Sequence, residues 1–255
     1  MKLLRLSRAG WIRLAIIAIL IGGLEVACRT GLIDKLTMIP PSEMVTGLVQ
    51  ILYSGSKTND ILNTMSNVAV ALSMAIVVGF LTGVALFLLP RVRRVVDPLL
   101  ATYYAIPIFV FYPFFVVLFG LNRMPQITVG FLLAVVAMII NTLNGFDRVP
   151  QVLLKTARVM RLSTATTIAR IILPYAALYI ATGLKLAVAY SFIGVIAAEF
   201  ILAGEGIGYE ISFAFNDFDN RTMYPLILLI VLIAGGINMA LYAWEKRFLA
   251  RQMER

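Results

Sequence analysis

The sequence predicts an all-α integral membrane protein with about six transmembrane helices. Of its 255 residues, 61% are hydrophobic and only 14% are charged, whereas soluble globular chains are about 45–50% apolar and about 25% charged. Apolar stretches that could cross a hydrocarbon core of about 30 Å as helices recur along the chain. Lysine and arginine gather in alternate connecting segments, as in multi-pass membrane proteins. These observations exclude a soluble enzyme, a disordered protein and a disulfide-rich scaffold.

Six apolar stretches are expected to form the spans, with turn-forming residues between them. The fourth stretch is the shortest, so its ends are the least defined. The expected spans are residues 12–26, 68–89, 99–119, 127–140, 175–201 and 226–244. The breaks between them carry Pro40-Pro41, Gly55, Pro90, Pro125, Pro150, Pro174, Gly204-Glu205-Gly206 and Pro225.

The first stretch has a second interpretation, because basic residues followed by an apolar run also describe a signal peptide. The run at residues 14–24 has a suitable length. A small-residue cleavage site is missing, since Glu25 and Val26 precede Ala27. The sequence therefore favours a retained first helix, with a cleaved signal peptide as the alternative.

The distribution of basic residues predicts that both termini are cytoplasmic. With the N-terminus inside, six spans leave sixteen Lys and Arg residues in cytoplasmic segments and five in outer segments. Since positive residues favour the cytoplasmic side, this placement also explains the net charge of +9 without a nucleic-acid partner. The cytoplasmic set is Lys2, Arg5, Arg8, Arg13, Arg91, Arg93, Arg94, Arg148, Lys155, Arg158, Arg161, Arg170, Lys246, Arg247, Arg251 and Arg255. The outer set is Arg29, Lys35, Lys57, Arg123 and Arg221.

Residues for catalysis or metal binding are scarce. The chain has no histidine and one cysteine, Cys28, which excludes histidine metal sites, a Ser-His-Asp triad and an internal disulfide. The glycine-rich residues 204–208 lack the Lys-Ser/Thr of a phosphate loop. We therefore expect no catalytic residue, no metal site and no cofactor bound by this chain. A membrane enzyme or a secretion scaffold, the alternative class, would need groups that the spans lack.

The polar segment at residues 143–173 is basic and is expected in the cytoplasm. Its pattern is typical of two short amphipathic helices, the second capped by Ser163, running over Thr164–Ile172 and stopping before Pro174. The apolar positions of the first are Val152, Leu153, Val159, Met160 and Leu162. A partly apolar loop between spans indicates a docked partner. The alternative is a helix on the membrane surface, with its arginines on lipid phosphates.

This segment resembles the EAA loop of bacterial ABC importer permeases, whose pattern is E-A-A-x3-G-x9-I-x-L-P. Four residues match at the right spacing: Ala157, Ile171, Leu173 and Pro174. Three residues depart from it: Lys155, Thr156 and Arg161 stand where the family has Glu, Ala and Gly.

Further segments within residues 38–210 resemble motifs of the nitrate/sulfonate/taurine branch of that family, in the same order. The motifs are LPSPS, RRLLDPLL, AIP…WFG and AEM…GLGYLI. The corresponding segments here are Ile39-Pro-Pro-Ser42, Arg93-Arg-Val-Val-Asp-Pro-Leu-Leu100, Ala105-Ile-Pro107 with Leu118-Phe-Gly120, and Ala198-Glu199-Phe200 with Gly206-Ile-Gly-Tyr209.

The resemblance implies a type I importer permease: one transmembrane domain over residues 1–255, a family-like core at 60–245 and a cytoplasmic coupling loop at 143–173. Two permease subunits would form the pore. Two ATPase subunits, which bind ATP and Mg, would hold the coupling loops, and a periplasmic or lipid-anchored binding protein would deliver substrate. The implied ATPase-coupling residues are Lys155, Thr156, Ala157, Arg158, Val159, Met160, Arg161, Leu162, Ile171, Leu173 and Pro174.

Within that loop, we expect Val159, Met160 and Leu162 to form one apolar anchor, with Arg158 and Arg161 as a charged rim. The glycine of the pattern permits a turn with φ > 0, where an arginine is strained, so we expect the bend to be displaced or milder. Lys155 reverses the family's charge, so its partner must differ. Both departures fit either a heterodimer with a different permease or a homodimer with a co-adapted ATPase.

Five residues are hypothesised to lie on the substrate path: Pro107, Phe109, Tyr112, Lys185 and Glu199. Prolines interrupt the aromatic third span, so its stretch 106–113 is expected to line the pore; lipid-facing bulk is the alternative for its aromatic side chains. Lys185 lies near the middle of a span, where a charge costs roughly 2.5–3.5 kcal/mol. It either attracts an anionic substrate, pairs with a carboxylate or snorkels to an interface. Glu199 is interpreted as a gate or packing residue rather than a ligand.

The resemblance also implies a substrate class and a location. The substrate would be a small anion such as a sulfonate, taurine, nitrate or an aromatic carboxylate, with a neutral pyrimidine-type vitamin precursor as the alternative. The location would be the bacterial inner membrane, with membrane lipids around a multi-pass chain.

Overall fold

The computed structural model describes residues 8–253, which are helical or irregular and contain no strand. Five helices in this range are long and apolar enough to cross a membrane, and a bent helix pair brings the number to six if it counts as one span. The predicted all-α membrane fold with about six spans is therefore confirmed. Lys2, Arg5 and Arg255 of the predicted cytoplasmic set lie outside the described residues.

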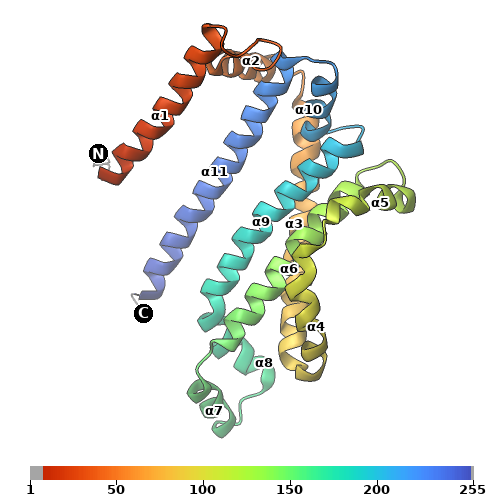
Figure 1. The fold of residues 1–255 in the computed structure, drawn as a ribbon. Helices are drawn as coiled ribbons and strands as arrows, with labels where there is room; N and C mark the ends of the chain where they lie inside the picture. The colour runs from red at the N-terminus through yellow and green to blue at the C-terminus, as the bar shows by residue number, and fades with distance from the viewer. Residues whose placement is uncertain (1–7, 254–255) are drawn as a thin grey trace. The chain divides into compact units, whose positions relative to one another are not determined.

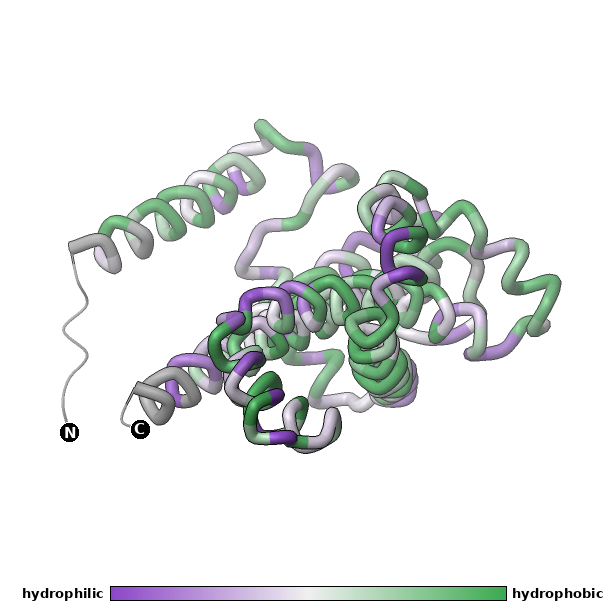
Figure 2. The backbone as a smooth tube through the Cα atoms, turned by 90° about the horizontal axis from the view of Figure 1, so that it is seen from below, coloured by the Kyte–Doolittle hydropathy of each residue, from purple (hydrophilic) through white to green (hydrophobic). Residues whose placement is uncertain are grey.

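The elements follow one another as shown in Figure 1. They are α1 Arg8–Arg29, α2 Pro41–Ser54, α3 Thr58–Leu88, α4 Pro90–Thr102, η1 Tyr103–Ala105, η2 Ile108–Phe111, α5 Tyr112–Phe119, α6 Met124–Asp147, α7 Gln151–Val159, α8 Thr164–Thr167, η3 Ile168–Ile172, α9 Leu173–Leu202, α10 Ile207–Asn216 and α11 Asn220–Met253. Figure 2 shows that hydrophobic residues dominate the long helices.

The third expected span is not one helix. Its two halves, Pro90–Ala105 and Ile108–Phe119, are bent by 88° relative to each other. The bend has a local cause, because Pro107 disfavours helical backbone at Ile106, which is extended with φ −88° and ψ 119°. Pro90 lies at the expected break between α3 and the third span, and it forms the first turn of α4, to which proline is well suited. Arg91, Arg93 and Arg94, all expected in a loop, therefore lie in α4.

Other boundaries also differ from expectation. The fourth span, expected at residues 127–140, extends over Met124–Asp147, so the start of the expected loop at 143–173 belongs to α6. Two helices, α2 and α10, were not predicted, because their short, mixed sequences lie in segments assigned to connections.

The described chain forms two compact parts, one from the residues up to Thr58 with Glu210–Leu232, the other from Asn59–Tyr209 with the residues from Ile233 onwards. The predicted single permease domain, with its core at 60–245, stays a prediction. In the first part, the Glu25 carboxylate of α1 caps α2. It accepts hydrogen bonds from the backbone N–H of Ser42 at 3.0 Å and from the Ser42 hydroxyl at 2.7 Å. A negative charge is favourable at a helix N-terminus.

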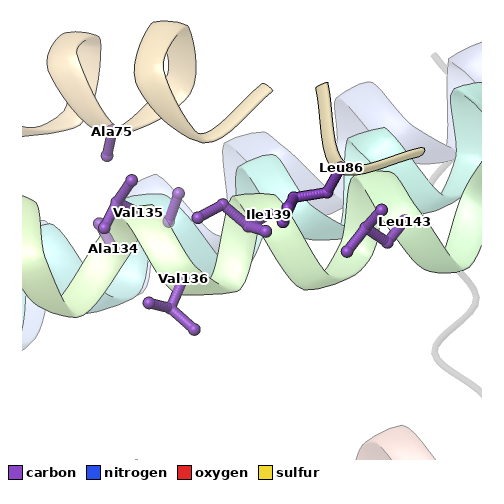
Figure 3. Packing of buried hydrophobic residues seen from close by; sticks show 8 residues of the cluster. Ala75, Leu86, Ala134, Val135, Val136, Ile139 and Leu143 are labelled. Atoms are coloured by element: carbon purple, nitrogen blue, oxygen red, sulfur yellow. The ribbon is translucent and has the colours of Figure 1, made fainter. Parts of the chain in front are cut away.

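The second part is built around α3, α6 and α9. One buried apolar cluster joins all three helices, and Figure 3 shows its members. The cluster contains Ala75 and Leu86 of α3, Ala134, Val135, Val136, Ile139 and Leu143 of α6, and Ala187 of α9. Small residues in this cluster let the helix backbones approach closely, as they do in other membrane helix bundles.

Two facing glycines bring the backbones of α6 and α9 close together. A Cβ atom on Gly194 would lie 2.7 Å from the Cα atom of Gly130 and 3.0 Å from its nitrogen. Because those atoms are backbone, they can move only if the helices separate. At this level the glycines therefore permit a close approach of α6 and α9.

We predict that Gly194→Ala lowers the stability of the detergent-solubilised protein by about 1–3 kcal/mol, the usual cost of overpacking a core. Gly235→Ala is the control, because nothing lies within 4 Å of the Cβ that it would add. Thermal unfolding measured by intrinsic fluorescence compares the two variants. Equal unfolding temperatures for both would contradict a close α6–α9 contact.

Candidate functional site

The EAA-like segment forms α7 and the turn that follows it. The N–H of Leu162 donates to the carbonyl of Ala157 at 3.0 Å, and the N–H of Arg161 donates to the carbonyl of Arg158 at 3.0 Å. These two hydrogen bonds, together with a left-handed residue immediately after the helix, form the Schellman motif that ends many helices. Arg161 is that residue, with φ +52°.

The expectation of a displaced or milder bend is therefore wrong. Arg161 takes the left-handed conformation at the position where the family pattern has glycine. A non-glycine residue pays roughly 1–2 kcal/mol for this conformation. Two backbone hydrogen bonds hold the turn in place, with Ala157 buried and Leu162 partly buried.

The second short helix begins as expected, because Ser163 accepts a hydrogen bond from the N–H of Thr166 at 3.2 Å. Its predicted end before Pro174 is wrong. The helix continues through a π-helical segment, η3, directly into α9. A local π adjustment is a known way to accommodate a proline, which offers no N–H to the preceding turn. The second helix of the loop is thus the start of α9.

The implied coupling residues divide into an inner and an outer set. The inner set anchors the loop: Ala157 is buried, and Ile171 and Leu173 pack against a buried cluster formed by Phe146, Val149, Ile172 and Ala176. The outer set is uncovered, with Val159 84% and Met160 65% exposed. Leu162 belongs to the inner side, so the expected apolar anchor of three residues contains only two of them. Lys155, Thr156, Arg158, Arg161 and Pro174 are exposed.

The five hypothesised substrate-path residues do not form one site. Tyr112, which is 1% exposed, and Phe109 pack in one cluster with Val129 and Ala198. Tyr112 also lines a cavity of about 490 Å³ together with Asn122, Gln126 and Glu205. Pro107 is exposed at the break between η1 and η2.

Lys185 is fourteen positions before Glu199 on α9, or about 21 Å along the helix axis. Its ammonium group donates to the Glu245 carboxylate of α11 at 2.6 Å. The sequence left three interpretations of Lys185 open: contact with an anionic substrate, pairing with a carboxylate, or snorkelling to an interface. The structure shows the pairing, with Glu245 as the carboxylate. A contact between Lys185 and substrate stays a prediction.

Glu199 is fully buried at the end of α9 that lies furthest from α7. Its carboxylate accepts hydrogen bonds from the Thr64 hydroxyl at 2.8 Å, the Gly208 N–H at 3.2 Å and the Asn67 amide at 3.5 Å. Thr64 in turn accepts from the N–H of Ile207 at 2.8 Å. The carboxylate therefore joins α3, α9 and the first turn of α10, where a helix terminus favours a negative charge.

The glycines of residues 204–208 make this arrangement possible. A Cβ atom on Gly206, whose φ is +105°, would lie 2.4–2.6 Å from the carboxyl atoms of Glu199. The glycine-rich string thus lets backbone approach a buried carboxylate. The geometry places the Glu199 carboxylate against protein donors, and its role as a gate or packing residue stays a prediction.

Two clusters of polar side chains were not predicted from the sequence. Beside Glu199, the Glu205 carboxylate binds Arg123 at 2.8 Å and Asn63 at 2.8 Å, and Arg123 also donates to Asn63 at 2.7 Å. Near the coupling segment, Arg93 holds Asp147 with two bonds of 2.7 and 2.6 Å. These partners are 54 to 142 residues apart in the chain, so local spacing gave no signal for them.

Comparison with known proteins identifies the family. The sequence profile of the binding-protein-dependent transport system inner membrane component family matches residues 45–253. The chain belongs to this family. It is a multi-pass permease of the inner membrane.

Similar curated permeases come from several bacteria. The bicarbonate transport system permease protein CmpB of Synechococcus elongatus is 31% identical over 194 residues, covering 74% of this chain and 68% of that protein. The nitrate import permease protein NrtB of Leptolyngbya laminosa is 29% identical over 75% of this chain and 70% of its own. The taurine transport system permease protein TauC of Escherichia coli is 26% identical over 95% of this chain and 90% of its own. The predicted nitrate/sulfonate/taurine branch is confirmed.

A solved structure shows the same fold. A chain of the MetNI methionine ABC transporter, in inward-facing conformations, matches with a TM-score of 0.63 at 17% identity, over 75% of this permease and 95% of that chain. The predicted type I importer-like fold is therefore confirmed.

We predict that Lys185→Glu destabilises the permease by about 1.5–3 kcal/mol, the range for hydrogen bonds to charged groups, because it faces Glu245 with a second carboxylate. The double variant Lys185→Glu/Glu245→Lys should recover most of this loss. Thermal unfolding of the single and double variants gives the coupling. A double variant no more stable than the sum of its singles would show that the pair contributes nothing, and uptake restored together with stability would argue against a substrate contact.

Proposed function

We propose that this chain is the transmembrane permease subunit of an ATP-driven, binding-protein-dependent importer, and that it forms the translocation path for a small anion. The observation that carries the proposal is the uncovered apolar face of α7, with Val159 and Met160 exposed at the EAA-like segment. Such a face in a polar, structured connection favours a protein partner. Family membership supports the importer role.

In this proposal the permease is not an enzyme. Two ATPase subunits bind ATP and Mg and receive α7, a second permease completes the pore as a homodimer or heterodimer, and a periplasmic or lipid-anchored protein delivers substrate. The connection from Arg148 to Ile172 joins α6 to α9, which pack closely. A movement of α7 by the ATPase would therefore move α6 and α9 together, a rigid-body switching mode.

The proposed substrate class rests on the relatives, which are named as bicarbonate, nitrate and taurine permeases. We expect this permease, reconstituted with its ATPase and binding protein, to take up one small anion of that kind: bicarbonate, nitrate, taurine, another sulfonate or a carboxylate. Competition against each labelled solute in proteoliposomes identifies it. Uptake of a neutral solute with no competition by any of these anions would refute the anion assignment.

We predict that Met160→Asp abolishes association with the ATPase and leaves the membrane-inserted permease folded, because apolar anchors dominate interface energies. Ala165→Asp is the control, since it adds the same charge at an exposed position in the first turn of α8, where an acidic residue is favourable. Co-purification and ATP hydrolysis in proteoliposomes measure the effect. Full ATPase binding by Met160→Asp would refute docking through α7, and a loss caused only by removing arginines would favour a membrane-surface helix.

We also propose that both termini and α7 lie in the cytoplasm, on the basis of the asymmetric lysine and arginine distribution. A cysteine at position 57 should react with a membrane-impermeant maleimide in intact cells, whereas one at position 155 should react only after permeabilisation. The opposite labelling pattern would reverse the topology.

A further inference from the structure

Lys155 lies in the middle of the face that α7 leaves uncovered. Helical spacing puts Val152, Lys155 and Val159 on one side, at i, i+3 and i+7. Val152 is 71% and Val159 84% exposed, and Lys155 is also exposed. The opposite side, with Leu154 and Ala157, is packed against the rest of the chain. Lys155 therefore lies on the same exposed face as Val152 and Val159, which we call the apolar stripe.

The surroundings of Lys155 offer no counter-charge. No aspartate or glutamate occurs between Arg148 and Ala198. The ion pairs found among the described residues involve none of Lys155, Arg158, Arg161 and Arg170. The exposed face of α7 and its turn is therefore cationic, and within residues 8–253 no acid forms an ion pair with it.

Docking changes the requirements at this position. Covering Val152, Val159 and Met160 removes water from these side chains, and the ammonium group of Lys155, which lies beside them on the same face, loses hydration as well. A charge buried without a partner costs several kcal/mol, whereas a well-placed opposite charge compensates for much of this loss. Arg158 and Arg161 flank the stripe and can keep their water, so they affect association rate more than affinity.

A membrane surface would select a different arrangement. An interfacial helix turns its apolar face into the lipid and its basic residues away from it. In α7 the basic residue interrupts the apolar stripe, and the face opposite that stripe is already covered by the same chain. A protein groove with a local negative charge fits this pattern better.

We propose that the ATPase groove that receives α7 carries an aspartate or glutamate directly opposite Lys155, so that docking forms one Lys–carboxylate pair surrounded by apolar contacts. The proposal rests on the proposed docking of α7 and adds the chemistry of the partner. It assigns to this permease a charge order opposite to that of the EAA pattern, in which the permease supplies the acid.

A zero-length carbodiimide cross-linker tests the contact in the assembled transporter. It joins an amine to a carboxylate that touches it, and Lys155 is the single lysine between Lys57 and Lys185. We expect an amide link from Lys155 to one Asp or Glu of the ATPase, identified by mass spectrometry. Lys155→Arg is the matched control, because it keeps the charge and should keep association while the link disappears. A link to no ATPase residue in an intact complex would overturn the proposal.

Affinity gives a second readout. Lys155→Glu should weaken ATPase association by about tenfold or more, since like charges then face each other. A lysine at the cross-linked acid of the ATPase should restore it. Arg170→Glu, the same reversal at an exposed site outside α7, should change affinity by less than about threefold.

The outcomes separate this proposal from the function on which it rests. Loss of binding in Met160→Asp with wild-type binding in Lys155→Glu would refute the carboxylate and leave docking intact. Unchanged binding in Met160→Asp would refute docking itself. Measurements in nanodiscs of phosphatidylcholine alone exclude anionic lipid as the partner, because an effect of Lys155→Glu that vanishes there would overturn the proposal in favour of the membrane.

Discussion

The close packing of α6 against α9 is the constraint on which the rest of the second part depends. At Gly130 and Gly194 the two backbones approach so closely that a single methyl group would separate them. In lipid, where apolar side chains gain little by leaving the solvent, such contacts replace the hydrophobic effect as the source of helix association. The chain leaves α6 and returns through α9 by way of α7. The proposed docking helix is therefore carried by the most tightly packed pair of helices in this part.

Polar clusters tie both ends of this pair to neighbouring helices. At one end, Arg93 of α4 holds Asp147 at the last turn of α6, immediately before the coupling segment. At the other, Glu199 of α9 gathers donors from α3 and α10. The buried Glu199 carboxylate has several donors, which offsets the cost of removing its charge from water, whereas Asp147 is exposed and, among the described residues, bound by Arg93 alone. Polar interactions thus hold the helices together at both ends of the bundle, and apolar side chains pack between these ends.

The turn after α7 shows how tertiary context overrides a local preference. An arginine disfavours the left-handed conformation, and this preference alone predicts a displaced bend. The observed turn keeps the position of the family's glycine because the hydrogen bond from Leu162 to the buried Ala157 closes the Schellman motif. The same turn exposes Met160 and Val159, which makes the strained residue part of the surface proposed to bind the ATPase.

The sequence by itself determined that most of the chain lies in lipid, its helical class, most of its spans and the position of the EAA-like segment. Apolar length, charge asymmetry and the EAA-like spacing are local signals. It also marked Lys185 and Glu199 as unusual, since charges in apolar helices are costly. Only the tertiary structure decided what those charges do, because Glu245 and Thr64 are 60 and 135 residues away from their partners. The break at Pro107, the continuation through Pro174 and the side of α7 left uncovered were likewise decided by packing, since a local pattern contains no information about which neighbours cover each face.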